Sequence, residues 1–190
     1  MNDNQKDIAI IERILRGEQS GYRELAQRHK DYAFTIAYKI LNHREDAEEV
    51  AQDAFMQAFG ALASFNREAK FTTWFYRIVF NAAVGFKRKH KVYTEDIESS
   101  SEAQWIASYA PPDAVQQTEQ RHYLNRALQQ LSDDDRVMLT LFYLKEHSLE
   151  EIADITGISA ETVKVKIHRA RKRLADEMKT MLKGEVRSLW

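Results

Sequence analysis

The sequence predicts an all-α protein of two small helical domains joined by a flexible acidic linker, with a helix-turn-helix in the second domain. Apolar residues recur at helical spacing through most of the 190 residues, and no stretch has a clear strand pattern. Two prolines and six glycines leave room for long uninterrupted helices. The helical pattern fails over residues 92–112, where acids, serines and a Pro-Pro pair replace it. We therefore expect domains at 1–91 and 113–190.

Four amphipathic helices are expected in the first domain. The first carries an apolar stripe that ends at Gly17, and the second follows Ser20. The third starts near Arg44 and has an alanine-rich face. The fourth follows the sequence FNREAK, with Thr72 or Thr73 as its candidate N-cap.

Four more helices are expected after the linker, the first of them over about residues 113–131. The second starts at Ser132, and three aspartates in its first turn complement the helix dipole. The third starts at Ser148, where Glu151 completes a capping box. The fourth starts at Ser159 and carries the sequence SAETVKVKIHRARKRL.

The composition excludes several classes of protein. There is no cysteine, which excludes a disulfide framework and a thiolate metal site. No apolar run approaches the roughly 18–20 residues that a membrane span needs. The sequence MNDNQKDIAI lacks the basic start and apolar stretch of a secretion signal. We therefore expect a cytoplasmic protein.

Charge is distributed in blocks that the net charge of −1 conceals. Residues 66–91 hold seven Lys or Arg and one acid, and residues 159–174 hold six Lys or Arg and one acid. Between these basic blocks, residues 92–120 hold six acids and no Lys or Arg.

Residues 148–174 have the pattern of a helix-turn-helix. Gly157 stands where the chain must turn, and Ser159 can cap the helix that follows. On that helix the residues expected to be buried lie within about 60° of one another, at ~100° per residue. They are Val163, Ile167, Ala170 and Leu174.

The opposite face of this helix combines a central valine with many cations. Val165, His168, Arg169 and Lys172 form its centre, bordered by Lys164 and Arg171 on one side and by Lys166 and Arg173 on the other. A helix in the major groove uses such cations for phosphates and its central line for base edges and thymine methyls. The alternatives are a solvated basic face and a membrane-surface or calmodulin-type helix.

The third helix carries a face of opposite charge. Its exposed residues are expected to be Glu45, Glu49, Gln52, Asp53 and Met56. Such faces are commonly just solvated, but a flexible methionine among the acids suits a protein contact. The acids should repel DNA, so this face would bind protein.

The segment SFNREAKFTTWFYRIVFNAAVGFKRKHK interleaves aromatic and basic residues. Seven aromatics lie between Phe65 and Phe86, among cations such as Arg67, Lys70 and Arg77. Single-stranded nucleic acid is bound in this way, because bases stack on rings while phosphates meet cations. The alternative is that all the aromatics belong to the core.

Over about residues 8–182, the sequence resembles the extracytoplasmic-function (ECF) class of bacterial sigma factors. DAEEVAQDAFMQAFGALASFNREAKFTTWFYRIVFN is similar to the family's core-binding and promoter-melting segment. LSDDDRVMLTLFYLKEHSLEEIADITGISAETVKVKIHRARKRL is similar to its upstream-element-binding domain. The resemblance implies a subunit that directs RNA polymerase core to promoters by recognising −10 and −35 elements.

The resemblance also implies roles for individual residues. Docking on the clamp coiled coil of the polymerase core would involve Glu49, Gln52, Asp53 and Met56. Capture of the −10 element would involve Asn66, Arg67, Lys70, Phe71, Trp74, Arg77, Asn81, Lys87 and Arg88. Binding of the −35 element would involve Lys164, Val165, His168, Arg169 and Lys172.

Further expectations follow from the same resemblance. An anti-sigma factor would hold the protein inactive, and the acidic linker would occupy the channel through which nascent RNA leaves; the alternative for the linker is a simple tether. We expect no cofactor, no metal site and no small-molecule substrate.

Two other classes of protein remain as alternatives. The first is a two-domain helix-turn-helix regulator that binds DNA without polymerase, which would need neither the acidic face nor the aromatic-basic segment. The second is an enzyme such as a nuclease. The six histidines are scattered without metal-ligand spacing, and a Walker-type loop is missing, so we expect no catalytic activity.

Overall fold

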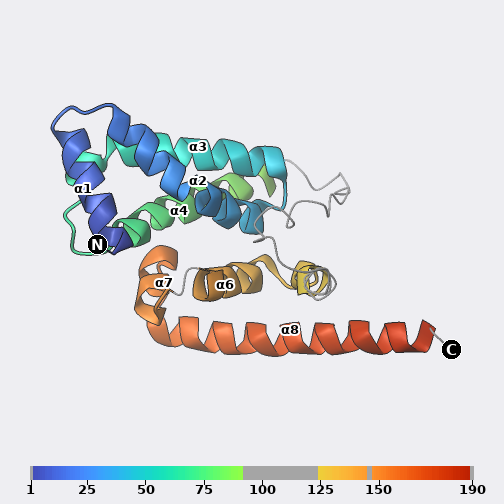
Figure 1. The fold of residues 1–190 in the computed structure, drawn as a ribbon. Helices are drawn as coiled ribbons and strands as arrows, with labels where there is room; N and C mark the ends of the chain where they lie inside the picture. The colour runs from blue at the N-terminus through green and yellow to red at the C-terminus, as the bar shows by residue number, and fades with distance from the viewer. Residues whose placement is uncertain (1, 92–123, 145–146, 189–190) are drawn as a thin grey trace.

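The computed structural model describes residues 2–91, 124–144 and 147–188 (Figure 1). The predicted linker and most of the helix predicted over residues 113–131 lie outside these ranges. Within the described residues all regular structure is helical, as predicted.

The first half is a bundle of four α-helices. They are α1 (Asp3–Leu15), α2 (Ser20–Leu41), α3 (Arg44–Gly60) and α4 (Phe71–Lys91), with a short 3-10 helix, η1 (Leu62–Ser64), after α3. Helices α2, α3 and α4 pack against one another, and α1 lies against α2 and α4.

Helix α4 follows FNREAK as predicted, but its predicted N-cap is wrong. The helix begins at Phe71, so neither Thr72 nor Thr73 is its N-cap, and Thr73 is buried within the first turn. The Phe71 backbone N–H donates instead to Asn4 Oδ1 at 3.2 Å, in α1. A side chain far away in the sequence therefore satisfies the N-terminus of α4, which local capping rules cannot foresee.

The second half contains α6 (Asp133–Leu144), α7 (Leu149–Thr156) and α8 (Ala160–Ser188), preceded by a helical segment at 124–129. Its predicted caps are confirmed. Ser132 Oγ accepts from the Asp135 backbone N–H, Ser148 and Glu151 form the capping box, and Ser159 Oγ accepts from the Thr162 backbone N–H. Helix α8 continues well beyond Leu174, where the basic stretch that indicated this helix ends.

Gly157 ends α7 in the left-handed conformation, with φ of 73°. Its backbone N–H donates to the carbonyl of Ala153 at 2.8 Å. This closes the last turn of α7 and redirects the chain into α8, as the helix-turn-helix pattern predicted.

The two halves pack against each other, which the sequence left open. Helix α7 lies against α4 and helix α6 lies against α2 (Figure 1). Buried apolar residues of both halves form one continuous cluster that includes Ile36 and Tyr76 of the first half and Leu141 and Ile152 of the second.

A buried polar group connects α1 to the rest of the first half. Asp7 is fully buried, and its Oδ1 lies 2.7 Å from Arg28 Nε and 3.0 Å from His29 Nε2. His29 Nδ1 lies 3.0 Å from the hydroxyl of Tyr76. Because a buried carboxylate is costly unless it is paired, these contacts fix how α1 sits on α2 and α4.

Two glycines give a matched test of this fold. Gly157→Ala should lower the free energy of unfolding by about 1 kcal/mol, because alanine is strained in the left-handed conformation. Gly85→Ala should raise it by about 0.5–1 kcal/mol, because Gly85 lies inside α4 and an added Cβ meets no heavy atom within 4 Å. Urea unfolding followed by circular dichroism measures both. Equal effects of the same sign would contradict the assigned turn.

Candidate nucleic-acid and protein interfaces

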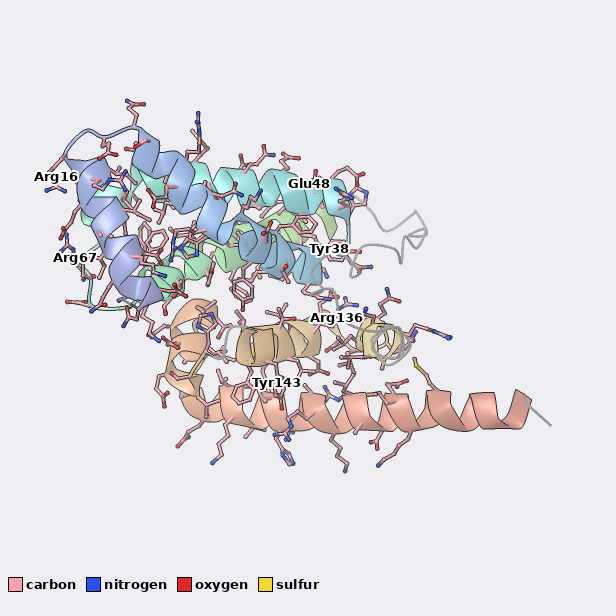
Figure 2. All side chains as sticks on the ribbon, viewed as in Figure 1. Arg16, Tyr38, Glu48, Arg67, Arg136 and Tyr143 are labelled. Atoms are coloured by element: carbon pink, nitrogen blue, oxygen red, sulfur yellow. The ribbon has the colours of Figure 1, made fainter. Side chains whose placement is uncertain are left out.

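The exposed ridge of α8 is the first candidate interface. As predicted, Val163, Ile167 and Ala170 are buried, against α6 and α7. Side chains on the side of α8 away from α6 project from the molecule (Figure 2). The five residues of the ridge, Lys164, Val165, His168, Arg169 and Lys172, are all exposed.

Val165 is 46% exposed at the centre of the ridge. Within the described part of the chain, no ion pair involves any of the four basic residues around it. A valine surrounded by unpaired Lys and Arg side chains fits a DNA groove, because these cations can meet phosphates while the valine meets a thymine methyl.

One flank of the ridge is used inside the domain, contrary to the symmetric arrangement predicted. Lys166 Nζ lies 2.9 Å from Asp134 Oδ2, and Arg173 pairs with Asp135. Both aspartates stand in the first turn of α6, so these pairs hold α8 against that helix. The flank with Lys164 and Arg171 remains exposed. Among the flanking cations, those without an ion pair in the described residues therefore lie on one side of the ridge.

The acidic face of α3 is the second candidate interface. Glu49, Gln52 and Asp53 are exposed, and Met56 is 71% exposed among them. Within the described residues, neither Glu49 nor Asp53 has an ion-pair partner, whereas the neighbouring Glu48 pairs with Arg44 at 2.7 Å. This face combines uncompensated negative charge with a flexible apolar side chain.

The loop between η1 and α4 is fixed by contacts at both of its ends. Arg67 has a positive φ of 62°, and its Nη1 lies 2.9 Å from Glu12 Oε1 of α1 (Figure 2). Lys70 Nζ lies 2.7 Å from Glu151 Oε1 of α7. Asn66 Oδ1 accepts from the Glu68 backbone N–H at 3.3 Å, so the loop is also ordered from within.

Most of the aromatics in this segment belong to the core. Phe65, Phe71, Phe75 and Tyr76 are buried, so the core alternative describes them better than base stacking does. The prediction that Phe71 contacts DNA requires correction, because its side chain is fully buried and packs against Phe75. Phe71 supports the loop from inside.

Trp74 is the predicted aromatic that stays partly accessible beside the loop. It is half-buried, with ring centroids 5.3 Å from Phe65 and 5.8 Å from Phe71. The buried rings hold the indole in place while part of it remains at the surface. This is the arrangement that a stacking platform requires.

Helix α4 carries an exposed stripe that sequence analysis found only in part. Arg77, Asn81 and Arg88 are exposed and share one face, as the spacing indicates. Val84 is 43% exposed on the same face and was not predicted. The signal that identified the α8 ridge, a valine within a basic line, was present here too. Lys87 turns away from the stripe and contacts Asp133 and the carbonyl of Ile40.

Within the described ranges, no helix is long and apolar enough to cross a membrane. The same residues contain no group of three or more His, Cys, Asp or Glu side chains placed to hold a metal ion.

Comparison with known proteins identifies the family. Residues 25–92 match the family Sigma-70 region 2, and residues 121–174 match Sigma-70, region 4. The ECF RNA polymerase sigma factor SigW of Bacillus subtilis is 31% identical over 180 residues, covering 90% of this chain and 96% of that protein. The chain belongs to the ECF class of RNA polymerase sigma factors. The ECF RNA polymerase sigma-E factor of Escherichia coli is 27% identical, covering 96% of this chain and 100% of its own length.

Two solved structures have the same fold as this sigma factor. One is the sigma factor RpoE in complex with the anti-sigma factor NepR from Bartonella quintana, with TM-score 0.69 and 24% identity over 83% of this chain and 96% of that chain. The other is CnrH in complex with the cytosolic domain of CnrY, with TM-score 0.65 and 22% identity over 92% of this chain and 97% of that chain.

The family assigns the two halves of this sigma factor. Region 2 includes α3, the loop at 66–70 and α4, and region 4 includes α6, α7 and the basic part of α8. Helix α1 lies outside both matches. The family that matches is one of transcription initiation factors that act with RNA polymerase, and it is not known as a family of enzymes.

Charge removal on the α8 ridge tests its contact with DNA. Lys164→Ala and Arg169→Ala should each weaken holoenzyme binding to promoter DNA. Each should also reduce the slope of log affinity against log salt by about 1, because one phosphate contact is lost. Filter binding at several salt concentrations measures both quantities.

Lys179→Ala is the control for this test, because it removes the same charge from α8 outside the ridge. It should leave the salt slope unchanged. Wild-type slopes in both ridge variants would exclude the ridge from the DNA interface.

Proposed function

We propose that this sigma factor binds the clamp coiled coil of the polymerase core through the acidic face of α3. Glu49 and Asp53 supply charge, and Gln52 and Met56 supply polar and apolar contacts. The proposal is supported by the exposure of all four side chains and by the missing partners of both acids within the described residues. Methionine is enriched at protein interfaces, and uncompensated charges can meet a partner surface of complementary charge.

The same proposal assigns the −35 element to the α8 ridge. The double-stranded element would accept the helix in its major groove, with Val165 and His168 toward the base edges. Lys164, Arg169 and Lys172 would contact phosphates. The one-sided distribution of free cations suggests that the phosphates of one strand are contacted more closely than those of the other.

The −10 element would bind as an unpaired strand to the loop at 66–70 and to α4. Asn66, Arg67 and Lys70 would contact an extruded base and its phosphates, and Trp74 would stack on a base. Further along α4, the exposed stripe with Arg77, Asn81 and Arg88 would follow the adjoining DNA. We add Val84 to the candidate DNA-binding residues because it is exposed, and we remove Phe71 because its side chain is buried.

Mechanistically, this chain would contribute binding energy and no covalent chemistry. Contacts to the unpaired strand offset the few kcal/mol needed to unstack a base from the duplex. The promoter would thus be opened where the loop and α4 bind the separated strand. The chemistry of RNA synthesis would belong to the polymerase core, and we expect the protein in the cytoplasm together with that core.

An anti-sigma factor is part of the proposal. The structural neighbours RpoE and CnrH were solved with NepR and with the cytosolic domain of CnrY, respectively. We expect a comparable protein partner for this sigma factor. It would have to cover the acidic face of α3 or the DNA-binding residues to keep the protein inactive.

The single observation that carries the core-binding proposal is the uncompensated acidic face of α3, so this face is the one to test. The variant Glu49→Lys, Asp53→Lys should lose co-elution with bacterial RNA polymerase core on gel filtration, whereas wild type co-elutes. Asp31→Lys, Asp154→Lys is the control, because it changes net charge equally at two exposed positions on α2 and α7. The control should bind like wild type.

The other outcomes are equally informative. Co-elution of both wild type and the α3 variant would place the docking face elsewhere on the protein. Failure of correctly folded wild type to bind core would contradict the proposed function as a whole.

A further inference from the structure

Arg67, in the loop at 66–70, has a backbone conformation that its neighbours in the sequence do not explain. Among the described residues, Asn42 and Arg67 alone have a positive φ without being glycine. Asn42 stands at the C-cap of α2, where the left-handed conformation is common. Arg67 lies within a loop whose five residues are all exposed. A left-handed conformation is strained in a residue with a Cβ, so it persists only where surrounding contacts hold it.

Helix α1 contacts this loop near both of its ends. Glu12 Oε1 lies 2.9 Å from Arg67 Nη1, and Figure 2 shows Arg67 beside α1. Asn4 Oδ1 accepts from the backbone N–H of Phe71, the residue that follows the loop, at 3.2 Å. Helix α1 also lies against η1, which precedes the loop. The strained arginine is therefore held by a side chain that is far away in the sequence.

Helix α1 is itself anchored in the bundle. Its buried face includes Ile10, Ile11 and Ile14, which belong to the core of the first half. Asp7 is fully buried on the same helix and pairs with Arg28 of α2. A helix fixed by both packing and a buried ion pair has little freedom to shift, so the side chains that it directs at the loop have a fixed origin.

The charge of Glu12 indicates a function beyond stability. The carboxylate stands beside a loop that is proposed to bind a nucleic-acid strand, and by charge alone it repels phosphates. The Arg67 side chain remains 44% exposed within the pair, so it is held in place and is still accessible to a strand. A side chain that is ordered in advance loses less conformational freedom on binding. This gain can offset the repulsion.

We propose that Glu12 is a positioning residue for recognition of the −10 element. Through Arg67 it holds the loop at 66–70 in the shape that accepts an extruded base, and it thereby contributes to the choice of that base. The inference rests on the proposed function of this loop. It also adds to promoter recognition a helix that lies outside the match to region 2, which begins at residue 25.

The variant Glu12→Gln tests this proposal, because charge and positioning predict opposite signs. Loss of the carboxylate should by itself strengthen binding to DNA, whereas loss of the Arg67 position should weaken it. The probe is the single strand that wild-type holoenzyme enriches most from a pool of short strands of random sequence, labelled with fluorescein. Holoenzyme with Glu12→Gln should bind it about threefold more weakly, the size of an exposed ion pair. Fluorescence anisotropy measures the affinity, and equal or tighter binding would overturn the proposal.

Base preference is a second readout, which a purely structural role would not change. A second strand differs from the probe only at its most strongly selected base. The ratio of the affinities for the two strands should be smaller for Glu12→Gln than for wild type, because a loosely held loop discriminates less between bases. A general loss of stability would weaken binding to both strands alike. An unchanged ratio would therefore contradict the positioning role.

Glu48→Gln is a matched control for Glu12→Gln. Glu48 pairs with Arg44 at 2.7 Å on α3, and the side chains of this pair are about as exposed as those of Glu12 and Arg67. The control removes the same charge and the same kind of ion pair without touching the loop. It should keep the affinity and the base preference of wild type. If it weakens binding as much as Glu12→Gln does, the effect is not specific to the loop and the proposal fails.

A double-mutant cycle distinguishes failure of this inference from failure of the proposed function. Arg67→Gln should weaken binding, and adding Glu12→Gln should weaken it no further, because Glu12 acts through Arg67. If Arg67→Gln binds like wild type, or if wild-type holoenzyme enriches no strand, the proposed −10 function of the loop fails. If Arg67→Gln weakens binding and Glu12→Gln adds its full effect to it, Arg67 keeps its −10 function and only the positioning role fails.

Discussion

Helix α4 is the constraint on which the rest of the structure depends, because it must serve three surfaces at once. Its apolar face, with Phe75 and Val79, completes the core of the first half. Its ends meet α6 and α7 through Lys87 and Lys70. Its remaining face exposes the stripe that includes Arg77 and Arg88. A helix used on every side has little freedom to shift, so the loop before it and the residues along it are held in fixed register for a nucleic acid.

Opposite charges on separate helices allow one chain to contact two kinds of partner. The acids of α3 favour a protein and repel DNA, whereas the cations of α8 and α4 favour DNA. Where acids and cations meet inside the protein, at α6 with α8 and at α7 with the loop, they set the arrangement of helices. The net charge of −1 is the sum over these acidic and basic surfaces, so it gives no information about any one of them.

Local signals in the sequence were sufficient for much of this fold. The caps at Ser148 and Ser159 and the turn at Gly157 depend on neighbours within a few residues, so spacing alone predicts them. The hydrogen bond at the start of α4 comes from α1, more than sixty residues earlier, and the ring of Phe71 packs against His29 of α2. The pairing of Lys166 with Asp134 and the packing of the halves are likewise long-range, and periodicity carries no information about which distant face a helix meets.

The buried carboxylate of Asp7 lies outside the residues that match the region 2 family, yet the first half of the structure depends on it. The match to region 2 starts at residue 25, whereas the partners Arg28 and His29 depend on a residue in α1. A chain trimmed to the family boundary would leave Arg28 and His29 without the Asp7 carboxylate that both contact. It would also lose the Asn4 side chain at the start of α4. The segment before the matched region thus stabilises the bundle from within, and dissection of this sigma factor into minimal domains must begin ahead of α1.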